Sequence, residues 1–153
     1  MIGANLVTYL ESEGYEGIYH NWMPDVDDTI IVVMDEAAPM LVDSVGFNVD
    51  QSGLHVLVRG MDSPGAYNVL KEIYDAVVGF YGLMDGVQVT QISPSQYPSY
   101  VDTDDRQRST YTAHFVARFT NDTRFRKDPV PPVFLTDDNG AILTDDNGTK
   151  LYA

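Results

Sequence analysis

The sequence contains no cysteine, which excludes disulfide bonds and every reaction that depends on a thiolate. A chain without cysteine also fits a reducing compartment. No stretch is long and apolar enough to span a bilayer, and the first residues lack the basic segment that opens a secretory signal. Apolar residues still make up 44% of the 153 positions. We therefore expect one domain with its own core and no membrane partner.

Basic residues are scarce, because nine Lys and Arg stand against 23 Asp and Glu and leave a net charge of −14. This balance argues against a general phosphate-binding surface. The few basic residues also come late: Arg59 is the first of them, and most of the others follow at Arg106, Arg108, Arg118, Arg124, Arg126 and Lys127. A chain with an acidic first part and a basic later part can bind its own copies head to tail and close a ring. The alternative is that both parts are solvated faces without self-association.

The strongest structural signal lies in residues 54–81. Leu54, Val56 and Val58 alternate with less apolar positions, which predicts a central strand ending at Gly60. Arg59 stands at the end of that strand, where a charge usually has a partner or a function.

A helix is predicted directly after this strand. Ser63 occupies the expected N-cap and Pro64 the first helical position, while Gly82 is the expected stop. Apolar side chains recur every three or four residues and should lie against the sheet; they are Tyr67, Leu70, Ile73, Tyr74, Val77 and Tyr81.

The remaining patterns predict an α+β domain over residues 1–128 with about four main strands. Helical spacing indicates a helix over 4–13, and β-branched or alternating residues indicate a brief strand over 15–20 and strands over 29–34, 87–92 and 109–120. Residues 40–48 could be an edge strand or a loop. Residues 93–105 hold Pro, Ser and Asp without a period, which predicts an exposed loop.

The last residues, 129–153, differ from the rest. Three prolines, at 129, 131 and 132, end the compact domain, and the segment Leu-Thr-Asp-Asp-Asn-Gly beginning at Leu135 recurs at Leu143. Each Asn-Gly favours a tight turn, so this extension is predicted to be a small β-meander arm. Such an arm needs a surface to dock on, and its apolar contacts would be Phe134, Leu135, Ile142, Leu143, Leu151 and Tyr152. Calcium binding is disfavoured because Asp137, Asp138 and Asn139 are consecutive.

No catalytic constellation emerges from the sequence. His20, His55 and His114 are isolated; His55 and His114 could meet on adjacent strands and hold a metal, although satisfied histidines are far more common. There is no nucleophile elbow, P-loop or dinucleotide fingerprint. Asp25 and its neighbours Asp27 and Asp28 lack a nearby basic partner and are predicted to form a solvated loop. We expect no enzyme activity, no catalytic residue, no cofactor and no metal.

Several short segments resemble the small neck proteins of tailed bacteriophages, which are the minor capsid and tail-terminator (tail-completion) proteins. The first set is 55–59 (HVLVR), followed by Ala-Tyr at 66–67 and Ile-Tyr at 73–74. The second is Pro24-Asp25 with Asp28 before a strand, and the third is the charged run 104–108 before the last strand. The match covers roughly residues 6–120 and leaves out the arm.

The resemblance implies a mostly antiparallel sheet flanked by helices, assembled as a ring that is usually a hexamer. In that family the ring ends the tail tube and joins it to the head, without enzyme activity or cofactor. The expected partners are copies of this chain, the tail tube protein and a head-completion or connector protein. DNA would pass through the lumen without specific binding, which an acidic body favours. The protein would be made in the host bacterial cytoplasm and reside in the virion neck.

From the charge distribution we expect the subunit interface to use basic side chains against acidic ones. The candidates are Arg59, Arg106, Arg108 and Arg118, together with Asp25, Asp27 and Asp28. Two other function classes remain open at this point: a head-completion or connector protein, and a monomeric acidic binding module that is metal-dependent or mimics nucleic acid.

Overall fold

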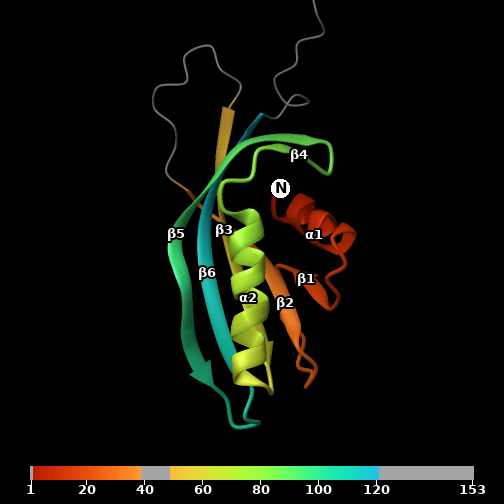
Figure 1. Cartoon of the computed structure of the whole chain (residues 1–153), viewed down its shortest axis with the longest axis vertical. Helices are drawn as coiled ribbons and strands as arrows, with labels where there is room; N and C mark the ends of the chain where they lie inside the picture. Colours follow the sequence, from red (N-terminus) through yellow and green to blue (C-terminus); the bar gives the residue numbers. More distant parts are fainter. Residues whose placement is uncertain (1, 39–48, 121–153) are drawn as a thin grey trace, which may run out of the picture. The chain divides into compact units, whose positions relative to one another are not determined.

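The computed structural model describes residues 2–38 and 49–120, which form two helices and six strands (Figure 1). Helix α1 is Ile2–Ser12 and helix α2 is Ser63–Val77. The strands are β1 (Ile18–His20), β2 (Ile30–Glu36), β3 (Val49–Gly60), β4 (Gly82–Met84), β5 (Val87–Thr103) and β6 (Ser109–Thr120). The predicted arm and the boundary at residue 128 lie outside the described residues, so both stay predictions.

The strands form one sheet in the order β1-β2-β3-β6-β5-β4. Strand β1 runs parallel to β2, and all other neighbours are antiparallel. The expectation of about four mostly antiparallel strands flanked by helices is therefore wrong: the sheet is mixed, has six strands and curls into a half-barrel. Both helices pack on the same face of it, because α1 and α2 share a single core with Ile31 and Val33 of β2.

Strand β5 is much longer than the sequence predicted, because residues 93–103 belong to it where a loop was predicted. Strand β4 pairs only with Val87, Gln88 and Val89, so among the described strands the rest of β5 has β6 on one side alone. Such an edge position tolerates Pro94 and the breaks in period, since proline has no N–H to contribute to a ladder. The register against β6 shifts four times along β5, which removes the regular alternation that sequence patterns detect.

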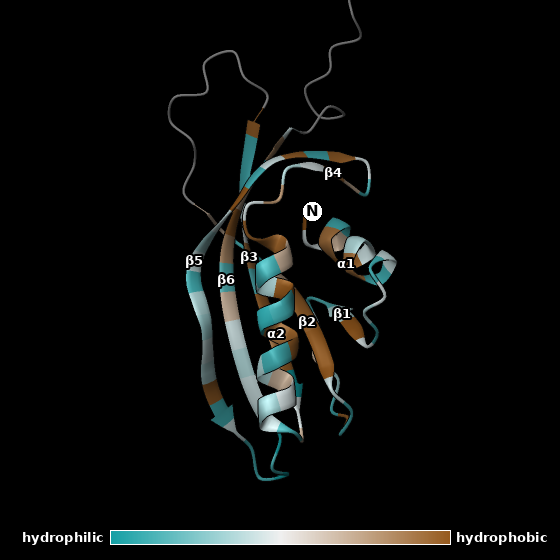
Figure 2. Ribbon diagram, viewed as in Figure 1, coloured by the Kyte–Doolittle hydropathy of each residue, from teal (hydrophilic) through white to brown (hydrophobic). Residues whose placement is uncertain are grey.

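The core lies between the sheet and the two helices. Leu70, Ile73 and Val77 of α2 are fully buried against Val56 of β3 and Phe115 of β6. Figure 2 shows the apolar residues of β2 and β3 lying behind α2. The predicted stripe on α2 is confirmed at these three positions, whereas Tyr81 lies outside the helix and is 76% exposed.

The ends of α2 differ slightly from the prediction. The N-cap is Asp62, so Ser63 is already helical, and the helix ends before Val78, which is extended. Gly79, with φ of 76°, follows directly and makes the turn expected at Gly82. Neither helix in the described ranges is long and apolar enough to cross a membrane.

Candidate functional sites

Five charged residues at one end of the sheet form a cluster within a single chain. The acidic loop (residues 22–28) leads into β2, and the 104–108 turn joins β5 to β6; both lie at the lower end of Figure 1. Arg108 Nη1 lies 2.6 Å from Asp25 Oδ1, and Arg106 Nη1 lies 2.9 Å from the same oxygen. Arg106 Nη2 also lies 2.5 Å from Asp27 Oδ1. We call Asp25, Asp27, Asp104, Arg106 and Arg108 the charged cluster.

The geometry of the turn sets the positions of both arginines. Asp104 Oδ1 accepts hydrogen bonds from the backbone N–H groups of Arg106 and Arg108, each at 3.0 Å. This is the local side-chain-to-backbone bonding that favours Asp in turns. The other carboxylate oxygen lies 2.7 Å from Arg108 Nη2. Arg108 is thereby held between Asp104 and the acidic loop, where it also donates to the Val26 carbonyl at 2.9 Å.

The pKa values in the charged cluster move in the direction that ion pairing dictates. Hydrogen bonds from the Arg108 side chain and backbone hold the pKa of Asp104 at about 2, below its ordinary value of 3.8. The Arg108 hydrogen bond and the neighbouring Arg106 charge lower the pKa of Asp25, while Asp104 and Asp25 raise the pKa of Arg108. Asp25, Asp104 and Arg108 are therefore all charged at neutral pH.

Acid should weaken the fold through Asp104. At pH values above 3.8 its carboxylate is ionised in both folded and unfolded chains, and the pairing contributes fully; as the pH falls toward 2, the unfolded chain takes up the proton first and stability is lost. We expect Asp104→Asn to flatten this part of the profile, measured as urea midpoints between pH 2 and 5. Asp105→Asn is the matched control, since exposed Asp105 makes no ion pair within 4.0 Å in the described ranges. Equal profiles for wild type and Asp104→Asn would contradict the prediction.

Arg59, at the end of β3, also holds the acidic loop. It is 9% exposed and donates from Nη2 to the carbonyls of Pro24 and Val26 and from Nη1 to the Met23 sulfur. Its Nε is buried and has no hydrogen-bond partner among the described residues. The partner predicted for a charge at the end of a central strand is thus the backbone of the acidic loop.

Five of the seven predicted interface residues take part in the contacts between the acidic loop and the rest of the described domain, whereas Arg118 and Asp28 do not. Arg59, Arg106 and Arg108 contact the loop, which itself carries Asp25 and Asp27. Arg118 instead donates from Nε to Gln51 Oε1 at 3.1 Å, near the other end of β6. Asp28 is exposed and makes no ion pair within 4.0 Å in the described part of the chain. Contact of these residues with a neighbouring subunit stays a prediction. The arm residues Phe134, Leu135, Ile142, Leu143, Leu151 and Tyr152 lie outside the described ranges.

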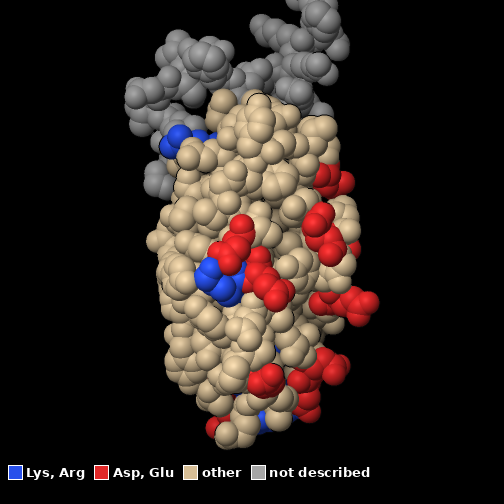
Figure 3. All heavy atoms as spheres, viewed as in Figure 1, with Lys and Arg blue, Asp and Glu red and all other residues tan. Residues whose placement is uncertain are grey.

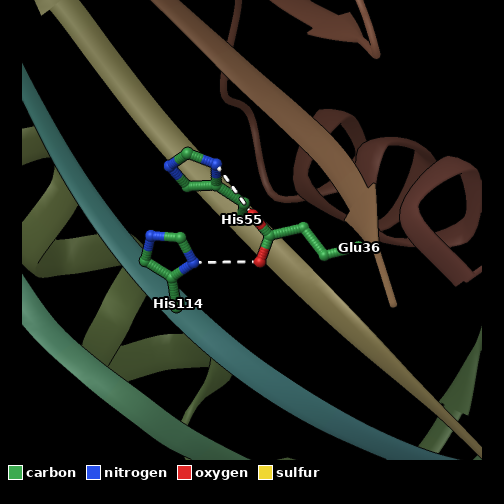
Figure 4. A group of neighbouring side chains, drawn as sticks. All are labelled: Glu36, His55 and His114. Atoms are coloured by element: carbon green, nitrogen blue, oxygen red, sulfur yellow. Dashed lines mark hydrogen bonds and ion pairs between the residues drawn. The ribbon is translucent and has the colours of Figure 1, made fainter. Parts of the chain in front are cut away.

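A second site lies on the face of the sheet that the helices do not cover. His55 of β3 pairs in register with His114 of β6, as the sequence suggested, and their rings stack at 4.0 Å between centroids with 14° between planes. Glu36 of β2 reaches both rings: Oε1 lies 3.3 Å from His55 Nδ1 and Oε2 lies 2.9 Å from His114 Nδ1. We call Glu36, His55 and His114 the histidine site (Figure 4).

Sequence reasoning missed Glu36, although a signal was present. Extending the alternation of β2 by one step beyond Met34 places Glu36 on the same face as His55, which is opposite Met34 in the register.

The third histidine also has a partner: His20 Nε2 lies 2.6 Å from Asp35 Oδ2, and Asp35 Oδ1 accepts the Gly3 N–H at 2.9 Å. Burial alone would raise the pKa of Asp35, but these hydrogen bonds outweigh it and lower the pKa. This contact ties β1 and α1 to β2.

Comparison with known proteins gives a match in structure and none in sequence. No protein-family model matches the chain, and no curated protein matches its sequence. Among solved structures, a chain from the virion of a native gene transfer agent (GTA) particle is similar, with a TM-score of 0.58 and 12% identity. The alignment covers 78% of this chain and 95% of that chain. The two chains therefore share a fold over nearly the whole of the virion protein.

Proposed function

We propose that this chain is a structural protein of a phage-like virion, acting in the neck as a ring that ends the tail tube and joins it to the head. The observation that carries the proposal is the shared fold, because it spans 95% of a chain from a gene transfer agent virion. The resemblance of residues 6–120 to tail-terminator proteins points to the same class independently. The proposed role rests on shape and assembly, without a bond-making reaction or a cofactor.

The charge distribution supports a role around DNA without binding to it. A net charge of −14 repels phosphate, so a lumen lined by this chain would let DNA slide. Figure 3 shows one face of the described domain, on which acidic groups gather over α1 and toward the lower end and basic groups are few. We propose copies of the chain, a tail tube protein and a head-completion or connector protein as partners, and the virion as its location.

The surface next to the charged cluster supports contact with another protein. Trp22 and Met23, in the acidic loop, are 58% and 39% exposed, and Met61, just after β3, is 53% exposed. Trp and Met are enriched in protein interfaces. Apolar side chains beside four exposed or partly exposed charges, those of Asp25, Asp27, Asp104 and Arg106, are the composition of an interface core with a polar rim. The arm of residues 129–153 is proposed to dock on a neighbouring subunit or another neck protein.

The oligomeric state tests this function directly. Light scattering after size exclusion should give the mass of a closed ring, for which we propose a hexamer, and negative-stain micrographs should show annuli. A chain that stays monomeric at high concentration, and also when mixed with tail tubes, would contradict the ring. The monomeric acidic binding module is the alternative that such a result would favour, since the acidic composition suits it equally well.

Charge reversal tests the proposed interface. We expect Arg106→Glu with Arg108→Glu to convert the ring to monomers on size exclusion, because both side chains would then repel the acids of the adjacent copy. Arg108 is only 7% exposed and belongs to its own chain's cluster, whereas Arg106 is 45% exposed. Arg106→Glu alone is therefore the sharper variant, and its circular dichroism should match the wild type.

Lys71→Glu is the matched control, since Lys71 pairs with Asp75 on α2, away from the acidic loop. It should leave the ring intact. A ring that survives Arg106→Glu and the double reversal would remove this surface from the interface.

A further inference from the structure

The histidine site unites three strands at one point of the sheet face opposite helices α1 and α2. His55 and His114 are direct partners in the β3–β6 register, and Glu36 lies one pair further along on β2, opposite Gly53. Because Gly53 has no side chain, nothing from β3 stands between Glu36 and the two rings at that level. In Figure 4 the carboxylate reaches across β3 toward both imidazoles.

The atoms that face one another are all metal-ligand atoms. The Nδ1 atoms of both rings are directed at Glu36, one at each carboxylate oxygen, at 3.3 and 2.9 Å. One ligand atom from each residue can be chosen so that all lie within 4.8 Å of one another. Two imidazole nitrogens and a carboxylate oxygen form the three-ligand set of many zinc sites, in which water takes the fourth position.

The opposite edge of the His55 ring is also supplied with a partner. His55 Nε2 hydrogen-bonds to the hydroxyl of Thr112, the β6 residue two positions before His114. A hydroxyl can donate or accept, so Thr112 can accept the Nε2 proton and leave the Nδ1 lone pair free for a cation. Metal-bound histidines typically donate their second N–H in this way.

The surroundings of His55 favour its neutral form, which is the form that binds metal. Burial lowers the pKa of His55, and the stacked His114 lowers it further, against the opposing effect of Glu36. Two protonated rings in contact would repel, whereas one cation between the two nitrogens and the carboxylate neutralises the anionic oxygen. The side chains remain accessible, with 19%, 26% and 38% of His55, His114 and Glu36 exposed.

We propose that Glu36, His55 and His114 bind one divalent transition-metal cation of the zinc class through His55 Nδ1, His114 Nδ1 and the Glu36 carboxylate. Water completes the coordination. Thr112 is a positioning residue that orients His55. The bound cation would cross-link β2, β3 and β6 within one subunit, and this does not depend on the oligomeric ring proposed above. Nitrogen ligands favour zinc, nickel, cobalt and copper over magnesium and calcium.

The test uses the wild-type chain without a polyhistidine tag, stripped of metal and titrated with ZnCl2. The chain has three histidines, so their ring signals in a proton NMR spectrum are few enough to follow individually. We expect two ring signals, those of His55 and His114, to shift and saturate at one equivalent of zinc. The His20 signal is the internal reference, because His20 pairs with a single carboxylate and no second ring. MgCl2 should shift none of them.

Variants then assign the ligands. His55→Gln, His114→Gln and Glu36→Gln should each weaken zinc binding by more than tenfold in calorimetry, and Thr112→Val by about tenfold. His20→Gln is the matched control and should bind zinc as the wild type does. If a variant fails to fold by circular dichroism, the wild-type NMR titration decides alone. Unchanged His55 and His114 signals up to millimolar ZnCl2, or equal shifts of all three histidines, would overturn the proposal.

Discussion

Replacing Phe115 with alanine is expected to lower the free energy of unfolding by about 3–5 kcal/mol. Phe115 is the largest fully buried side chain of the sheet, 1% exposed, and its ring centroid lies 5.6 Å from that of Tyr74 on α2. Truncation removes apolar contacts between β6 and α2 and leaves a cavity that rigid strands cannot close. Urea unfolding followed by tryptophan fluorescence or circular dichroism measures the loss.

A matched control separates burial from the chemical change. Leu83→Ala removes a large apolar side chain that is 68% exposed on β4. It should change the free energy of unfolding by no more than about 0.5 kcal/mol. If Phe115→Ala and Leu83→Ala unfold at the same urea concentration, the core between α2 and β6 is not as described.

Replacing Arg59 with methionine should cost about 1–3 kcal/mol of unfolding free energy, since the Pro24 carbonyl would lose its buried hydrogen bond from Arg59 and an unpaired buried polar group carries a penalty of that size. The methionine fills a similar length but cannot donate to the Pro24 and Val26 carbonyls. The acidic loop would lose its side-chain hydrogen bonds to Arg59 of β3. Cleavage within residues 22–28 during limited proteolysis should therefore become faster.

Arg118→Met is the control for this change. Arg118 is an exposed arginine on β6 that donates to the side chain of Gln51. Its replacement should leave both the unfolding free energy, within about 0.5 kcal/mol, and the cleavage pattern unchanged. An Arg59→Met variant as stable and as protease-resistant as wild type would show that the loop is held by the Arg106 and Arg108 pairs alone.

Patterns within one segment predicted the fold well where each strand or helix has a single buried face. Strand β6 alternates buried Ala113, Phe115 and Ala117 with less buried positions, and the predicted range matches the observed one. Helix α2 likewise shows its stripe in the sequence. Strand β3 begins earlier than predicted, at Val49, because its first residues are polar and only half buried.

The parts that failed depend on contacts between distant segments. The parallel pairing of β1 with β2 cannot be read from the three residues of β1, since a brief strand carries no signal of direction. The long β5 escaped prediction because proline and register shifts disguise an edge strand as a loop. The sheet class was wrong because β1 pairs in parallel, and the strand number was wrong because the three-residue strands β1 and β4 join the four longer ones.

In the candidate sites, too, some contacts could be predicted from patterns within single segments, and others depend on segments that are distant in the sequence. The meeting of His55 and His114 could be predicted, because two alternating strands with one histidine each can pair on the same face. The partners of Arg108 could not, since Asp25 is 83 residues away and is brought close only by the joint placement of the loop and the turn. Acidic residues interpreted as a solvated loop are in fact its ion-pair partners.

The outer edge of β5 limits how copies of this chain can join. Pro94 and Pro98 present no amide hydrogen, and the shifted register prevents a regular row of free donors and acceptors along this strand. A second chain therefore finds no continuous template on which to add a strand here, which guards the protomer against fibrillar stacking. An annulus joined at this edge would depend on side-chain contacts, and would come apart with salt or charge substitution while each protomer's own backbone ladder persists.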